Sequence, residues 1–439
     1  MKGGNGTAKR KLSAGTKCIL ILAVFVLIGS ALVLGKLSSG AKIDLSKLNM
    51  NVLDLQEDPS RNKEDQKESQ KEPEAKPAKK SEQTAAAEAP VVLKTEASFT
   101  LTVGGSISLS GEVRKNSKST DAKVADYADV MMLLAPQIRS DINVVFLENI
   151  ISDRHKASDI VSPGQAATLL TEAGFDMAAC GFAQAYSSGR DGVEATLMSL
   201  DSRGITALGI RYADDAGTPQ LRTVKGVKTA FLQYTATVPS KTRKTMEKDG
   251  TGDMVPEADP DRIAQDIGLA RQEGAEAVII FLSWGKTGGT APDKNQRELA
   301  EKTAAAGADL IIGSGSHIPQ TAEYLPGAEG KSVLCVWSPG TLLSGDRSNI
   351  KRISGYLLHV TIRGDGRGGV TVLNPEYTPV YTWKYKQDGR FYYRCIDSGK
   401  EAPDGMDSEQ RKMMVKSAEA VETALKDAPL SKRGSEDGP

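Results

Sequence analysis

The sequence predicts an α/β domain built on two mixed sheets, and three observations support this class. Helix-like and strand-like segments alternate along the middle of the chain. Two continuous apolar runs, Ala277–Leu282 and Asp309–Ile312, are typical of parallel strands that are buried on both faces. From Gly355 to about Lys386 the alternation gives way to successive strands with a glycine-rich turn at 364–369, which predicts antiparallel pairing.

The remaining elements follow from the spacing of apolar residues and from helix start and stop signals. A β-branched strand is expected to start at Phe99, and a last surface helix over 407–427. Further strands are expected at 143–147, 175–180, 205–208, 226–235 and 332–337. Further helices are expected at 125–138, 163–173, 192–203, 259–272 and 295–306. Two runs of alternating strands and helices followed by antiparallel strands indicate two mixed sheets around one core.

Composition excludes some classes of function. Lys+Arg and Asp+Glu are equal at 56 each in 439 residues, so no net charge favours a nucleic-acid partner. The four cysteines are too few for a disulfide framework in a domain of this size. We expect Cys180, Cys335 and Cys395 to be buried free thiols.

An apolar segment near the N-terminus predicts a membrane anchor. Its 18 uncharged residues, 18–35, nearly span a hydrocarbon core of roughly 30 Å. Residues 1–17 carry only positive charges, which predicts a cytoplasmic basic tail and an extracytoplasmic main domain. The protein would then be a single-pass protein of the cell membrane. A cleaved signal peptide is the alternative, with Ser39–Ala41 as the cleavage site, but the run exceeds a usual signal-peptide core of about 7–15 residues.

The rest of the chain divides by composition. Residues 36–97 are expected to be a juxtamembrane segment and a charged, disordered linker, because opposite charges and prolines leave little to bury. The α/β domain is expected over 98–390. Residues 391–439 would form a C-terminal segment with the surface helix and a polar tail.

Six loops follow predicted strands, and ligands of α/β sheets bind at the carboxyl ends of strands. These loops are 104–106, 148–149, 181–184, 283–286, 313–317 and 338–341. They supply the residues that we expect to line a ligand cleft, namely Gly105, Gln184, Ser283, Lys286, Ser316 and Thr341.

The same loops carry a resemblance to a known family. Residues 306–323, with the sequence Ala-Gly-Ala-Asp-Leu-Ile-Ile-Gly-Ser-Gly-Ser-His-Ile-Pro-Gln-Thr-Ala-Glu, match its longest motif, and Gly174–Asp176, Ser283–Gly285 and Leu147–Glu148 match others. Over roughly 98–363 the chain resembles the CapA-type capsule (poly-γ-glutamate) synthesis proteins of the calcineurin-like metallophosphatase superfamily. The resemblance implies a metallophosphatase-like α-β-β-α sandwich and, for an active member, a divalent-metal cofactor (Mn, Fe or Zn).

The chain departs from the family pattern at most metal- and phosphate-handling positions. Only Glu148 and His317 remain, while the other family positions hold Gly105, Phe146, Phe182–Gln184, Ser283, Gly315 and Thr341. A two-metal site holds its ions about 3.5–4 Å apart and needs ligands from several loops. The chain has three histidines, His155, His317 and His359, and only His317 lies in a motif. We therefore expect no cofactor.

The surviving residues admit two interpretations. Glu148 and His317 are the candidates for catalysis, and with Asp346 the candidates for holding a hard cation. Alternatively, His317 is a hydrogen-bonded structural residue, and Glu148 caps a loop or pairs with a cation such as Arg190 or Lys286.

The main functional hypothesis is a non-catalytic, extracytoplasmic CapA-like protein in the assembly of a capsular or envelope polymer. Its partners would be the membrane and an anionic polymer or the polymer-synthesis machinery. One alternative is a metal-dependent phosphoesterase-like hydrolase with a reshaped site, and another is a structural partner of a membrane complex.

Overall fold

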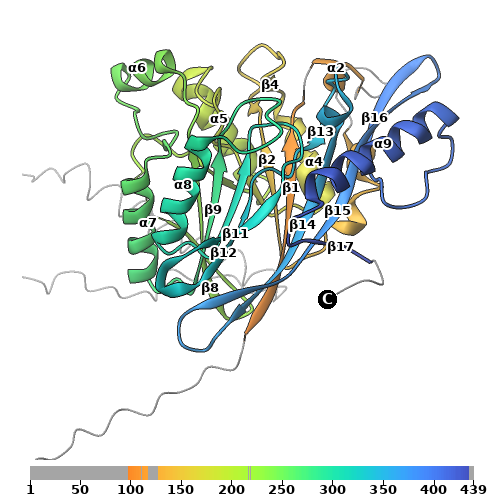
Figure 1. Ribbon diagram of the computed structural model, residues 1–439. Coiled ribbons are helices and arrows are strands. Elements are labelled where there is room, and N and C mark those ends of the chain that lie inside the picture. Colours follow the sequence, from red (N-terminus) through yellow and green to blue (C-terminus); the bar gives the residue numbers. More distant parts are fainter. Residues whose placement is uncertain (1–96, 110, 117–126, 216, 218, 435–439) are drawn as a thin grey trace, which may run out of the picture. The chain divides into compact units, whose positions relative to one another are not determined.

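Two mixed sheets form the centre of the fold (Figure 1), as the sequence predicts. The computed structural model describes residues 97–109, 111–116, 127–215, 217 and 219–434, all within the unit Glu88–Pro439. The expected basic tail, anchor and linker of residues 1–96 lie outside the described residues. Of the described helices, none has the length and apolar character needed to cross a bilayer.

The nine-stranded sheet begins with β1 (Ser98–Ile107) at its centre. Its order is β16-β15-β14-β1-β2-β5-β6, in which β1, β2, β5 and β6 are parallel and β14, β15 and β16 pair antiparallel. Two short strands, β13 and β17, pair with β1 and β15. The bounds are β2 Ile142–Leu147, β5 Met177–Ala179, β6 Thr206–Leu208, β13 Thr341–Leu343, β14 Ser354–Gly364, β15 Val370–Gln387, β16 Arg390–Asp397 and β17 Ser431–Lys432.

The six-stranded sheet has the order β11-β12-β10-β9-β8-β7. Its four inner strands are parallel, and the edge strands β7 and β11 pair antiparallel. The bounds are β7 Gln220–Val224, β8 Val227–Thr235, β9 Ala277–Ser283, β10 Leu310–Ser314, β11 Ala322–Pro326 and β12 Ser332–Val336. A separate pair, β3 (Ile150–Ile151) and β4 (Val161–Ser162), lies beyond β2 in the chain.

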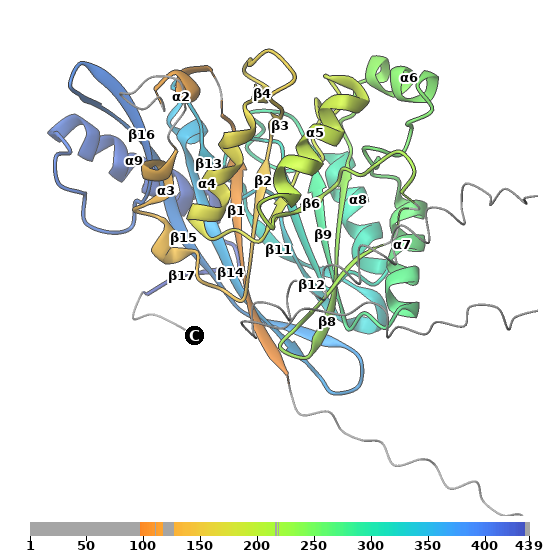
Figure 2. The same cartoon turned by 180° about the vertical axis from the view of Figure 1, so that it is seen from behind.

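Helices cover the outer face of each sheet (Figure 2). The apolar residues of α3, α4 and α5 pack on the nine-stranded sheet, and those of α7 and α8 pack on the six-stranded sheet. A third apolar layer lies between the sheets, and Phe146 and Phe281 meet there edge to face at 5.8 Å. Val421 and Leu425 of α9 complete this layer beside β14 and β15. The bounds are α2 Gly111–Asn116, α3 Ala128–Met131, α4 Thr168–Ala173, α5 Gly189–Asp201, α6 Ser240–Lys248, α7 Pro260–Gln272, α8 Lys294–Ala305 and α9 Ser408–Leu425.

Two expected helices differ from the structure. The helix expected over 125–138 is broken into α3 and a 3₁₀ turn at Ala135–Gln137. Pro136 explains the break, because its ring clashes with the carbonyl four residues earlier in an α-helix and it has no N–H to donate. The helix expected over 163–173 starts as a 3₁₀ turn and becomes α-helical only at Thr168.

The sheet also continues past residue 390, because β16 pairs along its whole length with β15. Sequence periodicity did not identify β16, nor the edge strands β7 and β11. The three described cysteines are buried and free, as expected.

His359 shows how the C-terminal end is joined to the nine-stranded sheet. The ring is buried in β14, and Arg433 donates to its Nδ1 at 2.8 Å while Nε2 lies 3.0 Å from the Thr378 hydroxyl. Since Nδ1 accepts from Arg433, the proton sits on Nε2 and the ring is neutral. Burial, and then the nearby Arg433 charge, lower the pKa of His359 to about 3.

We predict that this histidine makes the fold sensitive to acid. An unfolded histidine titrates near pH 6.5, so between about pH 6.5 and 3 the unfolded state binds the proton more readily and stability falls as pH falls. Replacing His359 by Gln should reduce the slope of unfolding free energy against pH by up to about 1.4 kcal/mol per unit. Urea melts from pH 7 to 4 would measure this slope. The matched loop variant His155→Gln should keep the wild-type slope, and equal slopes for all three proteins would contradict the prediction.

Candidate functional site

The carboxyl ends of strands from both sheets surround a cavity of about 450 Å³. Parallel strands bring their following loops to the same edge, which explains why residues distant in sequence meet there. The cavity is lined by mostly polar residues from both sheets: Ser108, Glu148, Asp159, Ile160, Phe182, Ala183, Gln184, Thr237, Ser283, Trp284, Gly285, Thr287, Gly315 and His317.

Glu148 and His317 contact each other through their charged or polar side-chain atoms in this cavity. Glu148 follows β2, and its Oε2 lies 3.2 Å from Nε2 of His317. The side chains are 13% and 26% exposed, respectively. Burial raises the pKa of Glu148, while His317 and a hydrogen bond from Ser314 oppose the rise. The pair therefore satisfies a carboxyl group that would otherwise be costly to bury.

Packing against Trp284 brings His317 to this position. A Cβ on Gly315 would lie 2.5 Å from the Trp284 carbonyl oxygen, and Gly315 has φ 108°, so the loop bends where only glycine fits. His317 itself has φ 55°, which is unfavourable for a residue with a side chain. Its carbonyl accepts a hydrogen bond from the Thr341 hydroxyl at 3.0 Å, which holds this conformation.

The structure brings together some of the expected cleft residues. Gln184 and Ser283 line the cavity with Glu148 and His317. Lys286 instead lines a neighbouring cavity of about 370 Å³ that shares Thr237, Trp284 and Gly285. Three expected residues do not line either cavity: Gly105, Ser316 and Thr341.

The reason in each case is backbone packing. Gly105 lies directly against Gly340, whose carbonyl oxygen would be 2.4 Å from an added Cβ. Ser316 is buried and its hydroxyl donates to the Ile318 carbonyl at 2.7 Å. Thr341 is buried beneath His317.

Two expectations about charged residues are corrected. Glu148 pairs with His317 rather than with Arg190 or Lys286, and Arg190 instead bonds Glu194 at 2.6 Å. Asp346 is not among the residues that line the cavity, and it lies 3.3 Å from Arg352. Hydrogen bonds from Ser348 lower the pKa of Asp346.

These donors do not fit a dinuclear metal centre. Such a centre needs several carboxylate, imidazole or amide ligands around two ions. Among the described residues no group of three or more His, Cys, Asp or Glu side chains could hold one ion. Glu148 and His317 contact each other, and the other family positions provide glycine, serine, phenylalanine, alanine, threonine and one amide, Gln184.

Several lining residues were not predicted. Thr237 follows β8, a strand whose following loop we did not consider, so the rule of strand ends could have found it. Trp284 and Phe182 lie within the expected loops and line the cavity, although both side chains are buried. Phe146, at a family ligand position, points into the layer between the sheets instead.

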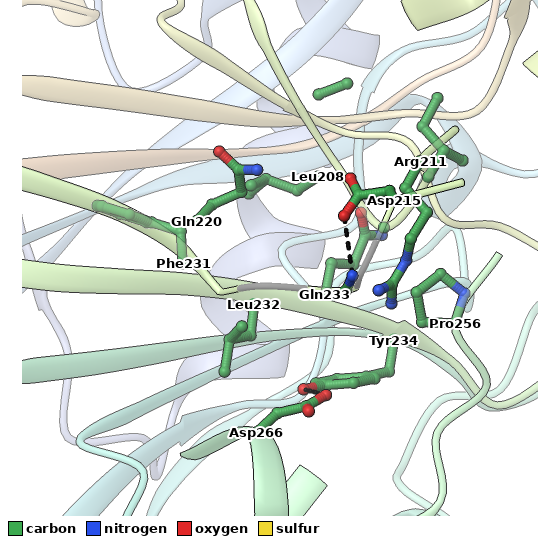
Figure 3. A pocket seen from close by; sticks show the side chains of 14 residues that line it. Leu208, Arg211, Asp215, Gln220, Phe231, Leu232, Gln233, Tyr234, Pro256 and Asp266 are labelled. Atoms are coloured by element: carbon green, nitrogen blue, oxygen red, sulfur yellow. Dashed lines mark hydrogen bonds between the residues drawn. The ribbon is translucent and has the colours of Figure 1, made fainter. Parts of the chain in front are cut away.

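A smaller cavity of about 60 Å³ lies near β6 and β8 (Figure 3). Its polar groups already have partners: the Tyr234 hydroxyl donates to Asp266 at 2.8 Å, and the Gln233 amide bonds both backbone groups of Gly181. A space of this size holds about two water molecules. It is therefore too small and too well satisfied for a substrate.

Comparisons with known proteins match the part of the chain that contains the cavity residues. A family model described as "Bacterial capsule synthesis protein PGA_cap" matches residues 100–346. The chain is 27% identical over 199 residues to the "PGA biosynthesis protein CapA" of Bacillus subtilis (strain 168), covering 44% of this chain and 50% of that protein. It is 30% identical over 101 residues to the "Capsule biosynthesis protein CapA" of Bacillus anthracis, covering 22% and 24%. The matches thus span half or less of these relatives.

Solved structures share less with the chain. A hypothetical protein from Thermus thermophilus has a TM-score of 0.37 at 16% identity, covering 64% of this chain and 99% of that one. The sulfate thiohydrolase SoxB of Thermus thermophilus has a TM-score of 0.36 at 12% identity, covering 72% and 59%. Scores this low do not establish a shared fold.

We predict that Glu148 and His317 stabilise the fold as a pair. His317→Ala should destabilise the protein by about 1–2 kcal/mol, because it leaves a buried carboxyl group without its partner. Glu148→Gln should cost less, since a neutral amide is easier to bury. The double variant should be more stable than the sum of the single effects implies, and denaturant melts of the four proteins would measure this coupling. Additive effects would contradict the pairing.

Proposed function

Because the chain belongs to the PGA_cap family of bacterial capsule synthesis proteins, we propose that it binds polymer during capsule assembly without two-metal catalysis. The observation that carries this proposal is the Glu148–His317 ion pair. It occupies the two surviving family positions with a contact of 3.2 Å, in a cavity large enough for a polymer segment. The polymer that the family resemblance suggests is poly-γ-glutamate.

The lining of the cavity supports binding. Ser108, Gln184, Thr237 and Thr287 offer hydroxyl and amide groups, and the buried residues Phe182 and Trp284 form part of the wall. Such a combination of a few polar groups on an apolar wall is typical of ligand pockets. The finer fold that we infer is the metallophosphatase-like sandwich, with the family site converted from metal binding to ligand binding.

We infer further that the domain acts outside the cytoplasm, held by the apolar segment 18–35. The length of this segment and the positive charges before it support a single-pass orientation with the N-terminus inside. An anchored binding domain would keep a growing polymer, or the machinery that makes it, at the membrane surface.

A hydrolase with a reshaped site is the second candidate. A carboxyl group with a raised pKa next to an imidazole in a cavity is an arrangement that also occurs in active sites. The unfavourable backbone of His317 is a further feature that functional sites share.

We predict that the purified full chain binds Mn, Fe or Zn only far below one ion per molecule. The physical reason is that its two remaining family donors contact each other and that the other family positions offer no carboxylate or imidazole. Elemental analysis after purification without chelators would measure this, together with hydrolysis of a generic phosphodiester such as bis(p-nitrophenyl) phosphate.

The matched variants are His317→Ala in the cavity and His155→Ala in a distant loop. Near-stoichiometric metal or phosphodiesterase activity that His317→Ala abolishes and His155→Ala retains would overturn the non-catalytic proposal and support the hydrolase.

A further inference from the structure

Cations and aromatic rings alternate along one face of the β15–β16 hairpin. The pairing register places Lys384 opposite Tyr393 and Lys386 opposite Phe391, so these four side chains share a face. Lys384 Nζ lies 4.3 Å from the centre of the Phe391 ring and 5.5 Å from that of Tyr393. Arg347 continues the series with its guanidinium carbon 5.4 Å from the Tyr393 ring. We call these five residues the cation–ring row.

The positive charges of the row are largely uncompensated. Among the described residues, Lys386 and Arg347 form no ion pair. Lys384 has one acidic partner: its Nζ lies 3.9 Å from Oε2 of Glu112, a side chain that is more than half exposed. The rings therefore hold the cations in place, where acidic side chains would otherwise do so. A row of positive charges with a single acidic partner among the described residues favours an anionic ligand.

Hydrogen-bond donors without partners at one end of the row also favour an anionic ligand. The Arg347 Nη1 donates to the Thr382 carbonyl at 2.7 Å and the guanidinium also approaches the Tyr381 hydroxyl, but by strict geometry its buried Nε and Nη2 have no hydrogen-bond partner in the described part of the chain. The hydroxyl of Tyr393, which is 3% exposed, also has none there. Buried donors without acceptors are rare in folded proteins, and a guanidinium fork is the group best suited to carboxylates.

The spacing indicates a chain rather than a single ion. Lys384 and Lys386 are two residues apart on one strand, so their Cα atoms are separated by about 6–7 Å. Arg347 extends the positive charge beyond Tyr393. An extended polymer with regularly spaced charges can contact both lysines, with the mostly buried Arg347 adding positive charge behind the Tyr393 ring.

The row also lies at the edge of the sheet that carries the cavity. The end of the β15–β16 hairpin is at the same end of the sheet as α2 (Figures 1 and 2). Glu112 of α2 approaches Lys384, and Ser108, just before α2, lines the cavity. A polymer on the row thus has a short route to the cavity.

We propose that the cation–ring row is a binding surface for an extended anionic polymer. The choice of polymer, a polycarboxylate such as poly-γ-glutamate, rests on the proposed function. The negative charge and extended form of the ligand are inferred from the row itself. The row lies outside the family match of residues 100–346, and its Arg347 end directly follows that match.

Fluorescence anisotropy of labelled poly-γ-glutamate with the full chain in detergent tests the proposal. Lys384→Gln/Lys386→Gln should weaken binding at least tenfold. The control Lys241→Gln/Lys244→Gln removes two lysines from α6 and should stay within twofold of the unaltered chain. Phe391→Ala keeps every charge but removes a ring that positions both lysines, and it should weaken binding several-fold. Labelled dextran, a neutral polymer, should not bind.

The outcomes separate this inference from the proposed function. Equal loss in both double-lysine variants would show a mere net-charge effect and overturn the inference, as would wild-type affinity in the Lys384/Lys386 variant. If His317→Ala abolishes binding while the Lys384/Lys386 variant does not, the cavity binds the polymer and only the row is rejected. If the unaltered chain does not bind the polymer, both the inference and the proposed function are overturned. If binding depends on the row and the protein also hydrolyses substrate in a metal-dependent way, only the non-catalytic proposal is rejected.

Discussion

The close packing of Trp284 determines the shape of the site. Its ring stacks on Trp337 with centroids 5.2 Å apart, and its Nε1 donates to the Trp337 carbonyl at 3.1 Å. A Cβ at Gly313 would lie 2.1 Å from the same nitrogen, so β10 must pass the ring without a side chain. Because Trp284 follows β9, Gly313 lies in β10 and Trp337 follows β12, one indole fixes three strand ends relative to each other. A smaller residue here would leave a void at the point where the site loops begin.

The ion pair at the site is a consequence of this packing. With Gly315 pressed against the Trp284 backbone, the chain turns sharply and places His317 over the end of β2, next to Glu148. The strained backbone of His317 is retained because Thr341 bonds its carbonyl and the imidazole meets a buried carboxyl group. The contact offsets two costs. The carboxyl group of Glu148 loses its hydration on burial, and the backbone of His317 adopts an unfavourable φ. In the same geometry the two side chains contact each other at 3.2 Å.

The sequence alone was enough to predict the buried strands and four of the cavity residues. Runs such as Ala277–Leu282 are apolar because both faces are covered, and strand ends converge by topology, so Glu148, Gln184, Ser283 and His317 could be placed at one edge. Local spacing does not show which loop side chains turn inward, so Ser316 and Thr341 were misplaced. The cation–ring row was also missed, because it depends on the register between β15 and β16. The Asp388–Gly389 dipeptide between alternating residues was an available hairpin signal.

Strand direction explains why the row and the cavity share an edge. β14 is antiparallel to β1, and β15 is antiparallel to β14, so β15 runs in the same direction as β1. Its carboxyl end, which carries Lys384 and Lys386, therefore reaches the level at which β1 and β2 end and the site loops begin. A hairpin added at this side of the sheet extends the binding edge without disturbing the packing around Trp284. The lysines of the cation–ring row thus lie at the same end of the sheet as the loops that line the cavity.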